Sequence, residues 1–205
     1  EVGATLHPQS PVEGIDVADG RVAAVDVGGR LDATVEADAV VNAAGPWAGR
    51  LAALAGVSVP MAPTRGVMVA VDDPDPGVGA VLNRCRPPAD GDIVVPRPRA
   101  GEAVLGTTSV AVEDPDDFER DGREVDRTVA ECARLCPAVA DRPVRRTYWG
   151  VRPLYAPDEA ARGDGRAISR EFALLDHADD GVDGLVTVVG GKLTTHRLMA
   201  EATAD

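Results

Sequence analysis

Short apolar stretches that alternate with polar residues run through much of the chain, and glycine, proline and aspartate separate them. Near the start, Val12–Val17 and Val22–Val27 flank Asp19-Gly20. An Asp-Gly connection between two alternating stretches is a strong signal for a β-hairpin. A third apolar piece, Leu31–Val35, follows. The pattern therefore predicts a three-stranded antiparallel meander.

Two further stretches predict a buried strand that turns directly into a helix. In Ala39–Ala48 the apolar strand ends in small residues, and Pro46 suits the first helical turn. In Gly184–Glu201 the strand Leu185–Val189 stops at Gly190-Gly191, and a helix follows. Glycines let a ligand approach the backbone closely, and the first turn of a helix presents unpaired N–H groups. This second turn is therefore predicted to bind an anion.

From Pro60 the chain changes to short strands with closely spaced turn residues, which predicts a domain boundary and a second, antiparallel sheet. Asp90-Gly91 and Ala100-Gly101 are the predicted turns. The predicted strands are Gly66–Val71, Gly79–Asn83, Asp92–Val95, Ala103–Thr107, Thr147–Tyr155 and Ala167–Leu175. Strand-to-helix turns combined with an antiparallel sheet make the fold class a mixture of α/β and α+β.

One helix, about Arg123 to Cys136, is predicted within this second region. Asp121 before it and Glu124 three residues later have the spacing of a capping box. Cys132 and Cys136 lie on its apolar side. Because no His or third Cys accompanies them, we expect buried thiols rather than a metal site. The apolar stripe of the helix consists of Val125, Val129, Cys132 and Cys136.

The net charge of the chain limits the kinds of partner that it could bind directly. Acidic residues number 34 against 21 basic ones, which gives a formal net charge of −13 and argues against direct binding to nucleic acid or to an anionic membrane. Lysine occurs once. An acid excess with almost no lysine is typical of halophilic proteins, in which dense salt screens the repulsion within an acidic surface. The alternative is an ordinary acidic protein from a GC-rich genome.

Nothing in the sequence predicts insertion into a membrane or export. No run approaches the roughly 18 apolar residues of a membrane span, and the first residues carry no basic-then-apolar signal segment. Cys85, Cys132 and Cys136 do not form a disulfide framework, which agrees with a reducing compartment. We therefore expect a cytoplasmic protein.

Three cations occupy positions where a phosphate could bind. Lys192, the only lysine, lies in the glycine-rich turn before the last helix. Arg152 and Arg170 lie on or beside strands whose other residues are apolar, where a guanidinium without an anionic partner is costly. Each arginine could instead pair with one of the many carboxylates of the chain. Together, a planar guanidinium and a point charge make a reasonable receptor for a phosphate dianion.

Four strings resemble those of the FAD-dependent glycerol-3-phosphate dehydrogenases, in particular the anaerobic type whose flavin subunit works with iron–sulfur partners. The strings are VVNAAGPWA, YWGVRPL, AISREFALLDH and DGLVTVVGGKLTTHRLMAE. The resemblance covers nearly the whole chain. GGKLTTHR together with GVRPL is specific, whereas VVNAAG is shared with the wider glycine-oxidase and sarcosine-oxidase superfamily.

The resemblance implies an FAD-binding, Rossmann-like domain in two pieces, residues 1–59 and 183–205, with an antiparallel-sheet substrate domain, residues 60–182, between them. By this likeness the backbone of Val12 contacts the adenine end of FAD. The resemblance also implies that small residues after the meander line the cofactor. A second set of residues would lie at the pyrimidine edge of the flavin, where a helix N-terminus stabilises the anionic reduced ring. The small residues are Ala43, Ala44 and Gly45, and the second set is Gly190, Gly191, Lys192, Leu193 and Thr194.

The resemblance also implies a substrate and partners. Arg152, Arg170 and Lys192 match positions that hold sn-glycerol 3-phosphate, and Arg152 and Lys192 are the expected catalytic residues. The implied reaction is hydride transfer from C2 of the substrate to flavin N5 while the C2 hydroxyl loses its proton, which gives dihydroxyacetone phosphate. Iron–sulfur and membrane-anchor subunits are the implied partners, which would place the protein peripherally at the inner face of a membrane. A flavin-dependent amine or amino-acid oxidase and a non-catalytic binding or assembly module are the alternatives.

The chain departs from the family pattern at three points. Met68 stands where aerobic relatives have a histidine, and a thioether cannot take a proton, so the general base is unassigned. His196 replaces the usual tyrosine and is interpreted as a surface or packing variant. No G-x-G-x-x-G occurs, so the phosphate-binding turn of a dinucleotide domain is missing with the strand and helix around it. We therefore expect an incomplete flavin domain that by itself neither retains FAD nor turns over.

Overall fold

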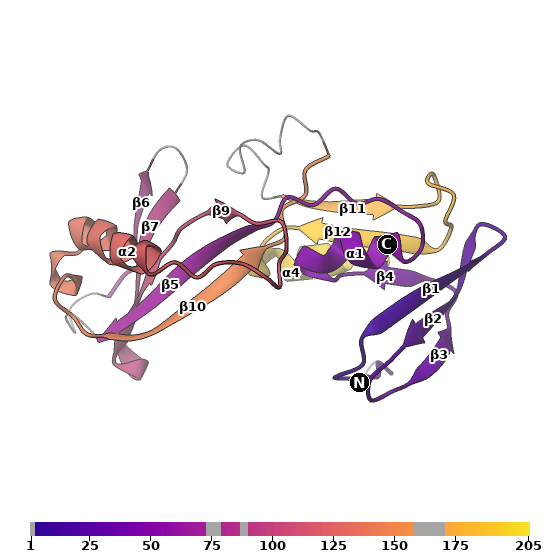
Figure 1. Ribbon diagram of the computed structural model, residues 1–205, viewed down its shortest axis with the longest axis horizontal. Coiled ribbons are helices and arrows are strands. Elements are labelled where there is room, and N and C mark those ends of the chain that lie inside the picture. Colours follow the sequence, from indigo (N-terminus) through magenta and orange to yellow (C-terminus); the bar gives the residue numbers. More distant parts are fainter. Residues whose placement is uncertain (1–2, 73–78, 87–89, 158–170) are drawn as a thin grey trace. The chain divides into compact units, whose positions relative to one another are not determined.

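The computed structural model describes residues 3–72, 79–86, 90–157 and 171–205, and the chain divides into two compact units (Figure 1). Several antiparallel sheets and few helices confirm the predicted mixed α/β and α+β class. The assignment of flavin and substrate binding to separate domains stays a prediction. Unit 1 comprises Glu1–Met61, Pro153–Pro157 and Ser169–Asp205, and unit 2 comprises Ala62–Arg152 and Asp158–Ile168.

The predicted meander is confirmed in unit 1. β1 (Val12–Ala18) and β2 (Arg21–Val27) pair antiparallel around Asp19-Gly20, whose φ angles are 52° and 78°. These left-handed angles are those of a type I′ hairpin turn. β3 (Ala33–Glu36) pairs with β2 and begins two residues later than predicted, because Asp32, with a φ of 47°, still belongs to the turn.

The second sheet of unit 1 has the strand order β11–β12–β4. β11 (Phe172–Asp176) runs antiparallel to β12 (Leu185–Gly190). β12 runs parallel to β4 (Val40–Asn42), with Thr187 opposite Asn42. The prediction for β11 began at Ala167, in a part of the chain outside the described residues.

A helical segment follows each of the two parallel strands. After β4 come a 3₁₀ turn, η1 (Gly45–Trp47), with Pro46 in its first turn, and α1 (Ala48–Ala53). After β12 come η4 (Leu193–Thr195) and α4 (His196–Ala204). Both predicted strand-to-helix turns are therefore confirmed, and each helical segment opens with a 3₁₀ turn.

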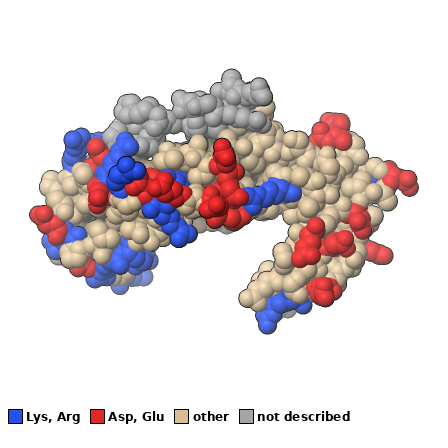
Figure 2. Space-filling view, viewed as in Figure 1, with Lys and Arg blue, Asp and Glu red and all other residues tan. Residues whose placement is uncertain are grey.

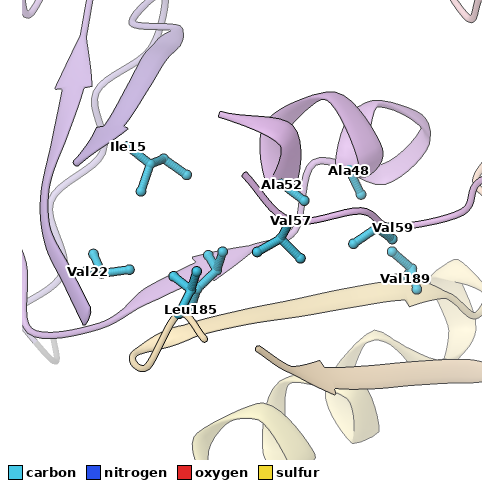
Figure 3. Close-up of a cluster of buried hydrophobic side chains, with 9 residues drawn as sticks. Ile15, Val22, Ala48, Ala52, Val57, Val59, Leu185 and Val189 are labelled. Atoms are coloured by element: carbon cyan, nitrogen blue, oxygen red, sulfur yellow. The ribbon is translucent and has the colours of Figure 1, made fainter. Parts of the chain in front are cut away.

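Small and β-branched side chains form the core of unit 1. Figure 3 shows Ala48 and Ala52 of α1 on the side of β12 that carries Leu185 and Val189. Side chains alternate along a strand, so Val188 points to the opposite face. The buried cluster is composed of Ile15, Val22, Ala48, Ala52, Val57, Val59, Val182, Leu185 and Val189. One face of the sheet is thus sealed by α1 and the meander.

Unit 2 contains one antiparallel sheet, as predicted, and its strand order is β10–β5–β8–β7–β6, with the short β9 also paired to β5. β11, which was predicted within this region, pairs instead with β12 in unit 1. One helix, α2 (Gly122–Leu135), packs on the sheet of unit 2 through Cys132. The strands are β5 (Thr64–Asp72), β6 (Leu82–Arg86), β7 (Asp90–Arg97), β8 (Glu102–Gly106), β9 (Val110–Ala111) and β10 (Val144–Arg152), and the 3₁₀ turns are η2 (Pro98–Ala100) and η3 (Pro137–Val139).

Three local predictions in unit 2 are wrong. Asp90-Gly91 is not a turn, because both residues belong to β7 and Gly91 pairs with Cys85. β6 begins at Leu82 rather than at Gly79, whereas β7 contains the predicted Asp92–Val95 and extends two residues further at each end, since the pairing of the two strands outweighs a local turn preference. β10 ends at Arg152 rather than at Tyr155, because Pro153 has no N–H to donate to a neighbouring strand.

The start of α2 follows the prediction in part. Asp121 accepts a hydrogen bond from the Arg123 N–H at 2.9 Å and therefore caps the helix. The capping box is incomplete, because the Glu124 carboxylate binds Arg65 of β5 instead. Cys132 and Cys136 are buried, as predicted.

The buried thiol of Cys132 should react slowly. Desolvation raises its pKa to about 11, so that the reactive thiolate is scarce at neutral pH. Cys85 is exposed. We expect Cys85 to react with Ellman's reagent at least about tenfold faster than Cys132 at pH 7, and Cys85→Ser to remove the fast phase. A fast phase that survives in Cys85→Ser would contradict this.

Candidate functional site

Acidic side chains dominate the meander of unit 1. Residues 12–36 include six acidic residues and two basic ones. Figure 2 shows Asp and Glu side chains over the surface of these strands. Because like charges repel an anion, this surface is a poor binding site for a phosphate.

The two strand-to-helix turns of unit 1 open at one edge of its second sheet. β4 and β12 are adjacent and parallel, so their carboxyl ends point the same way. Ala43, Ala44 and Gly45 follow β4, and Gly190 and Gly191 lie at the end of β12. In open α/β sheets, ligands bind just outside the carboxyl ends of the strands. The structure therefore brings together the two segments that the sequence assigns to the cofactor.

Backbone conformation at this edge requires glycine. Gly190 has a φ of 75°, and a Cβ there would lie 2.5 Å from the carbonyl oxygen of Glu171, which no other residue could tolerate without displacement. Gly45 has a φ of 59°, and apart from Gly45 and its two chain neighbours no described residue has an atom within 4 Å of the place where its Cβ would be. The turn after β4 is thus open to the close approach of a flat ligand, as FAD would need.

Lys192 lies at the start of η4 with its backbone fixed by Thr195. The Lys192 N–H donates to Thr195 Oγ1 at 3.1 Å, and its carbonyl oxygen accepts from the Thr195 N–H at 2.9 Å. The Lys192 side chain is exposed and forms no ion pair with any described residue. Leu193 and Thr194 are exposed as well. The ammonium is therefore available to an anionic ligand.

An apolar groove of about 480 Å³ lies beside α4 in unit 1. His196 Nδ1 lies 2.7 Å from the Leu193 carbonyl oxygen, and since a carbonyl only accepts, Nδ1 carries the proton. Both Ala43 and His196 line the groove. The lining residues are Val41, Ala43, Val188, His196, Met199, Ala200, Thr203 and Ala204. Its apolar walls suit an apolar part of a ligand rather than a phosphate.

Arg152, at the end of β10 in unit 2, is held by neutral oxygens. Its Nη2 donates to Thr107 Oγ1 and to the Thr108 carbonyl oxygen, both at 3.1 Å. A Cβ on Gly66 would lie 2.6 Å from this Nη2, so the glycine makes room for the guanidinium across β5. Arg152 is half-buried. These two hydrogen bonds fix the position of Nη2.

One predicted residue, Val12, lies away from these positions. Val12 is at the start of β1, opposite Val27, where it packs on the core of unit 1. Arg170 lies outside the described residues. Lys192 belongs to unit 1 and Arg152 to unit 2.

Sequence reasoning missed the residues that fix the candidate site residues within each unit. In unit 1 these are Asn42 and Thr187, which are buried and hydrogen-bonded to each other. In unit 2 they are Gly66, Thr107 and Thr108. The signal for the first pair was a polar residue inside an otherwise apolar strand, which is costly unless a partner exists.

None of the helices in residues 3–72, 79–86, 90–157 and 171–205 combines the length and the apolar character needed to cross a membrane. Over the same ranges, no three His, Cys, Asp or Glu side chains gather as a metal site would require.

Comparison with known proteins gives consistent matches. The model of the family "FAD dependent oxidoreductase" matches residues 1–205. The anaerobic glycerol-3-phosphate dehydrogenase subunit A1 of Haloferax volcanii is 42% identical over 219 residues, which cover 100% of this chain and 36% of that protein. The chain thus spans about a third of the length of this relative.

Two solved structures resemble the fold. The glycerol-3-phosphate dehydrogenase from Bacillus halodurans, complexed with FAD, matches with a TM-score of 0.69 and 26% identity over 96% of this chain and 37% of that chain. Glycine oxidase from Bacillus cereus matches with a TM-score of 0.71 and 20% identity over 96% of this chain and 47% of that chain. The second similarity concerns the fold alone.

Proposed function

Because the chain belongs to the family of FAD-dependent oxidoreductases, we propose that it is part of a flavoprotein that oxidises sn-glycerol 3-phosphate to dihydroxyacetone phosphate. The similarity to the Haloferax volcanii subunit over the whole chain supports this substrate. The glycine-oxidase likeness supports only the fold, so an amine or amino-acid oxidase is the weaker alternative.

One observation carries the proposal. Two turns that resemble flavin-contacting strings follow neighbouring parallel strands and open at the same edge, beside the only lysine of the chain. At that edge, Ala43, Ala44 and Gly45 would hold FAD from the β4 side. Residues 190–194 would hold it from the β12 side. When bound, FAD would accept the hydride from C2 of the substrate.

Three basic side chains bind the substrate phosphate in this proposal. The Lys192 ammonium and the Arg152 guanidinium neutralise the phosphate dianion and orient the substrate, and Arg170 joins them. Thr107 and Thr108 fix the position of Arg152 Nη2, which supports a positioning role for this guanidinium. The positive end of the helical segment at Lys192 adds to the same field.

The partner subunits and the location of the protein are inferred from the same similarity. The relative from Haloferax volcanii is named as subunit A1 of its enzyme, which supports further subunits here. We infer that iron–sulfur and membrane-anchor subunits pass the electrons on and that this chain is cytoplasmic. The net charge of −13 and the single lysine support function at high salt.

The test is anaerobic reduction of the flavin in the full-length polypeptide that carries this chain, purified in high salt with FAD. We expect glycerol 3-phosphate to bleach the oxidised flavin absorption, and glycerol, which lacks the phosphate, to leave it unchanged. Bleaching by sarcosine or glycine instead would favour the oxidase. A protein that binds FAD and responds to none of these reductants would contradict the proposal.

A further inference from the structure

A series of buried hydrogen bonds runs through unit 1 from its surface to the turn after β4. His177 follows β11 and is 1% exposed. Its Nδ1 lies 2.8 Å from Asp180 Oδ2, and its Nε2 lies 2.8 Å from Thr187 Oγ1. Thr187 Oγ1 lies 3.2 Å from Asn42 Nδ2, and Asn42 Oδ1 accepts the N–H of Ala44 at 3.2 Å. We call Asp180, His177, Thr187 and Asn42 the relay.

The chemistry of the partners fixes the direction of each bond in the relay. The Asn42 amide N–H groups donate to Thr187 Oγ1 and, at 2.8 Å, to the carbonyl oxygen of Ala48. An ionised Asp180 only accepts, so His177 Nδ1 carries a proton. In the neutral imidazole, Nε2 then accepts the hydroxyl hydrogen of Thr187. Donors and acceptors match at every step.

The order of carboxylate, imidazole and hydroxyl is that of a nucleophilic triad, but burial excludes that chemistry. Thr187 and Asn42 are both 0% exposed, so no substrate can reach the hydroxyl. The relay instead ties together three segments that are distant in sequence: the loop after β11, the middle of β12 and the end of β4. Each member is satisfied only while the others keep their places, which is why a complete buried network defines one geometry.

Asn42 is the point where the relay meets the candidate site. It is the last residue of β4, and its side chain holds both the Ala44 N–H and the first residue of α1, Ala48. The turn between them contains Gly45. We propose that the relay positions this turn for FAD, so that His177 and Thr187 are positioning residues of the cofactor site. The proposal rests on the proposed function, because it requires the turn to lie against FAD.

The test compares Thr187→Val with Thr187→Ser in the full-length polypeptide. Valine removes the hydroxyl at nearly constant shape, and serine keeps it. We expect Thr187→Val to raise the dissociation constant for FAD about tenfold, the effect of roughly one lost hydrogen bond, and to change the visible absorption of the bound flavin. Thr187→Ser should stay within about twofold of the unchanged protein.

Two further variants keep the test decisive. Thr128→Val makes the same chemical change at a buried threonine of α2 in unit 2 and should leave FAD affinity unchanged. At the solvent end of the relay, where the Asp180 side chain is 57% exposed, folding is least at risk. Asp180→Ala should weaken FAD binding about threefold, whereas Asp180→Asn keeps an oxygen that accepts from His177 and should not.

The possible outcomes distinguish failure of the positioning proposal from failure of the proposed function. If Thr187→Val and Asp180→Ala bind FAD as tightly as the unchanged protein does, the relay does not position the turn for FAD. A loss that Thr187→Ser fails to restore, or an equal loss in Thr128→Val, would also overturn the positioning proposal. If Thr187→Val does not fold, the comparison of Asp180→Ala with Asp180→Asn decides. An unchanged protein that binds no FAD would overturn the proposed function instead.

Discussion

Replacing Lys192 with methionine is expected to lower kcat/KM for glycerol 3-phosphate roughly 10- to 100-fold in the full-length polypeptide. A charge-assisted hydrogen bond contributes about 1.5–3 kcal/mol, and each 1.4 kcal/mol is a factor of ten. Methionine keeps an unbranched side chain of similar length and removes only the charge and its donors. If the ammonium holds the phosphate in the ground state and the transition state alike, most of the loss will be in KM.

The matched control is Arg197→Met, which removes an exposed cation from α4 five residues further on. It should change kcat/KM by less than about twofold, since screened surface charges contribute little. Arg152→Leu should resemble Lys192→Met, because both side chains are assigned to the phosphate. Equal losses in Lys192→Met and Arg197→Met would mean that general electrostatic attraction, and not a contact with the phosphate, is responsible.

Features set by neighbouring residues were predictable from the sequence. The hairpin at Asp19-Gly20 follows from the positive φ angles that these two residue types tolerate. The strand that stops at Gly190-Gly191 and the helix cap at Asp121 follow in the same way from the conformational range and hydrogen bonding of single side chains. In each case the residues that decide the structure lie within a few positions of one another.

Features set by pairing of distant segments were not predictable. Asp90-Gly91 carries a turn signal, yet pairing with β6 holds both residues in β7. Glu124 has capping-box spacing, yet it binds Arg65, which is 59 residues away. The periodicity of a strand gives its faces but neither its neighbour nor its register, and these determine which side chains meet.

The candidate site shows the same division. Its glycine turns can be read locally, but the edge where they meet depends on parallel pairing of β4 with β12, about 145 residues apart, as are Asn42 and Thr187. Only the resemblance linked the two turns in advance. The residues that support Arg152, on the segment around Thr107, lie 45 positions before it and had no local signal.

Arg65→Met is expected to lower the free energy of unfolding of unit 2 by about 3–5 kcal/mol, because it leaves a buried carboxylate without its partner. The side chains of Arg65 and Glu124 are only 8% and 14% exposed. The second oxygen of Glu124, Oε2, is buried and has no hydrogen-bond partner in the described part of the chain. Arg65 also lies 5.1 Å from the ring centre of Trp149, and methionine retains part of that contact.

The double variant Arg65→Met/Glu124→Leu separates the loss of a partner from the loss of the pair. Replacing both members of a buried ion pair by apolar residues is often neutral, so the double variant should recover most of the lost stability. Urea unfolding followed by Trp149 fluorescence, in a Trp47→Phe background that removes the only other tryptophan, reports on unit 2. Arg134→Met breaks an ion pair with Glu131 on the same helix, in which the arginine side chain is 70% exposed. This variant should lower the free energy of unfolding by less than about 1 kcal/mol. A double variant no more stable than Arg65→Met would show that the stacking of Arg65 on Trp149, and not the stranded charge of Glu124, accounts for the loss.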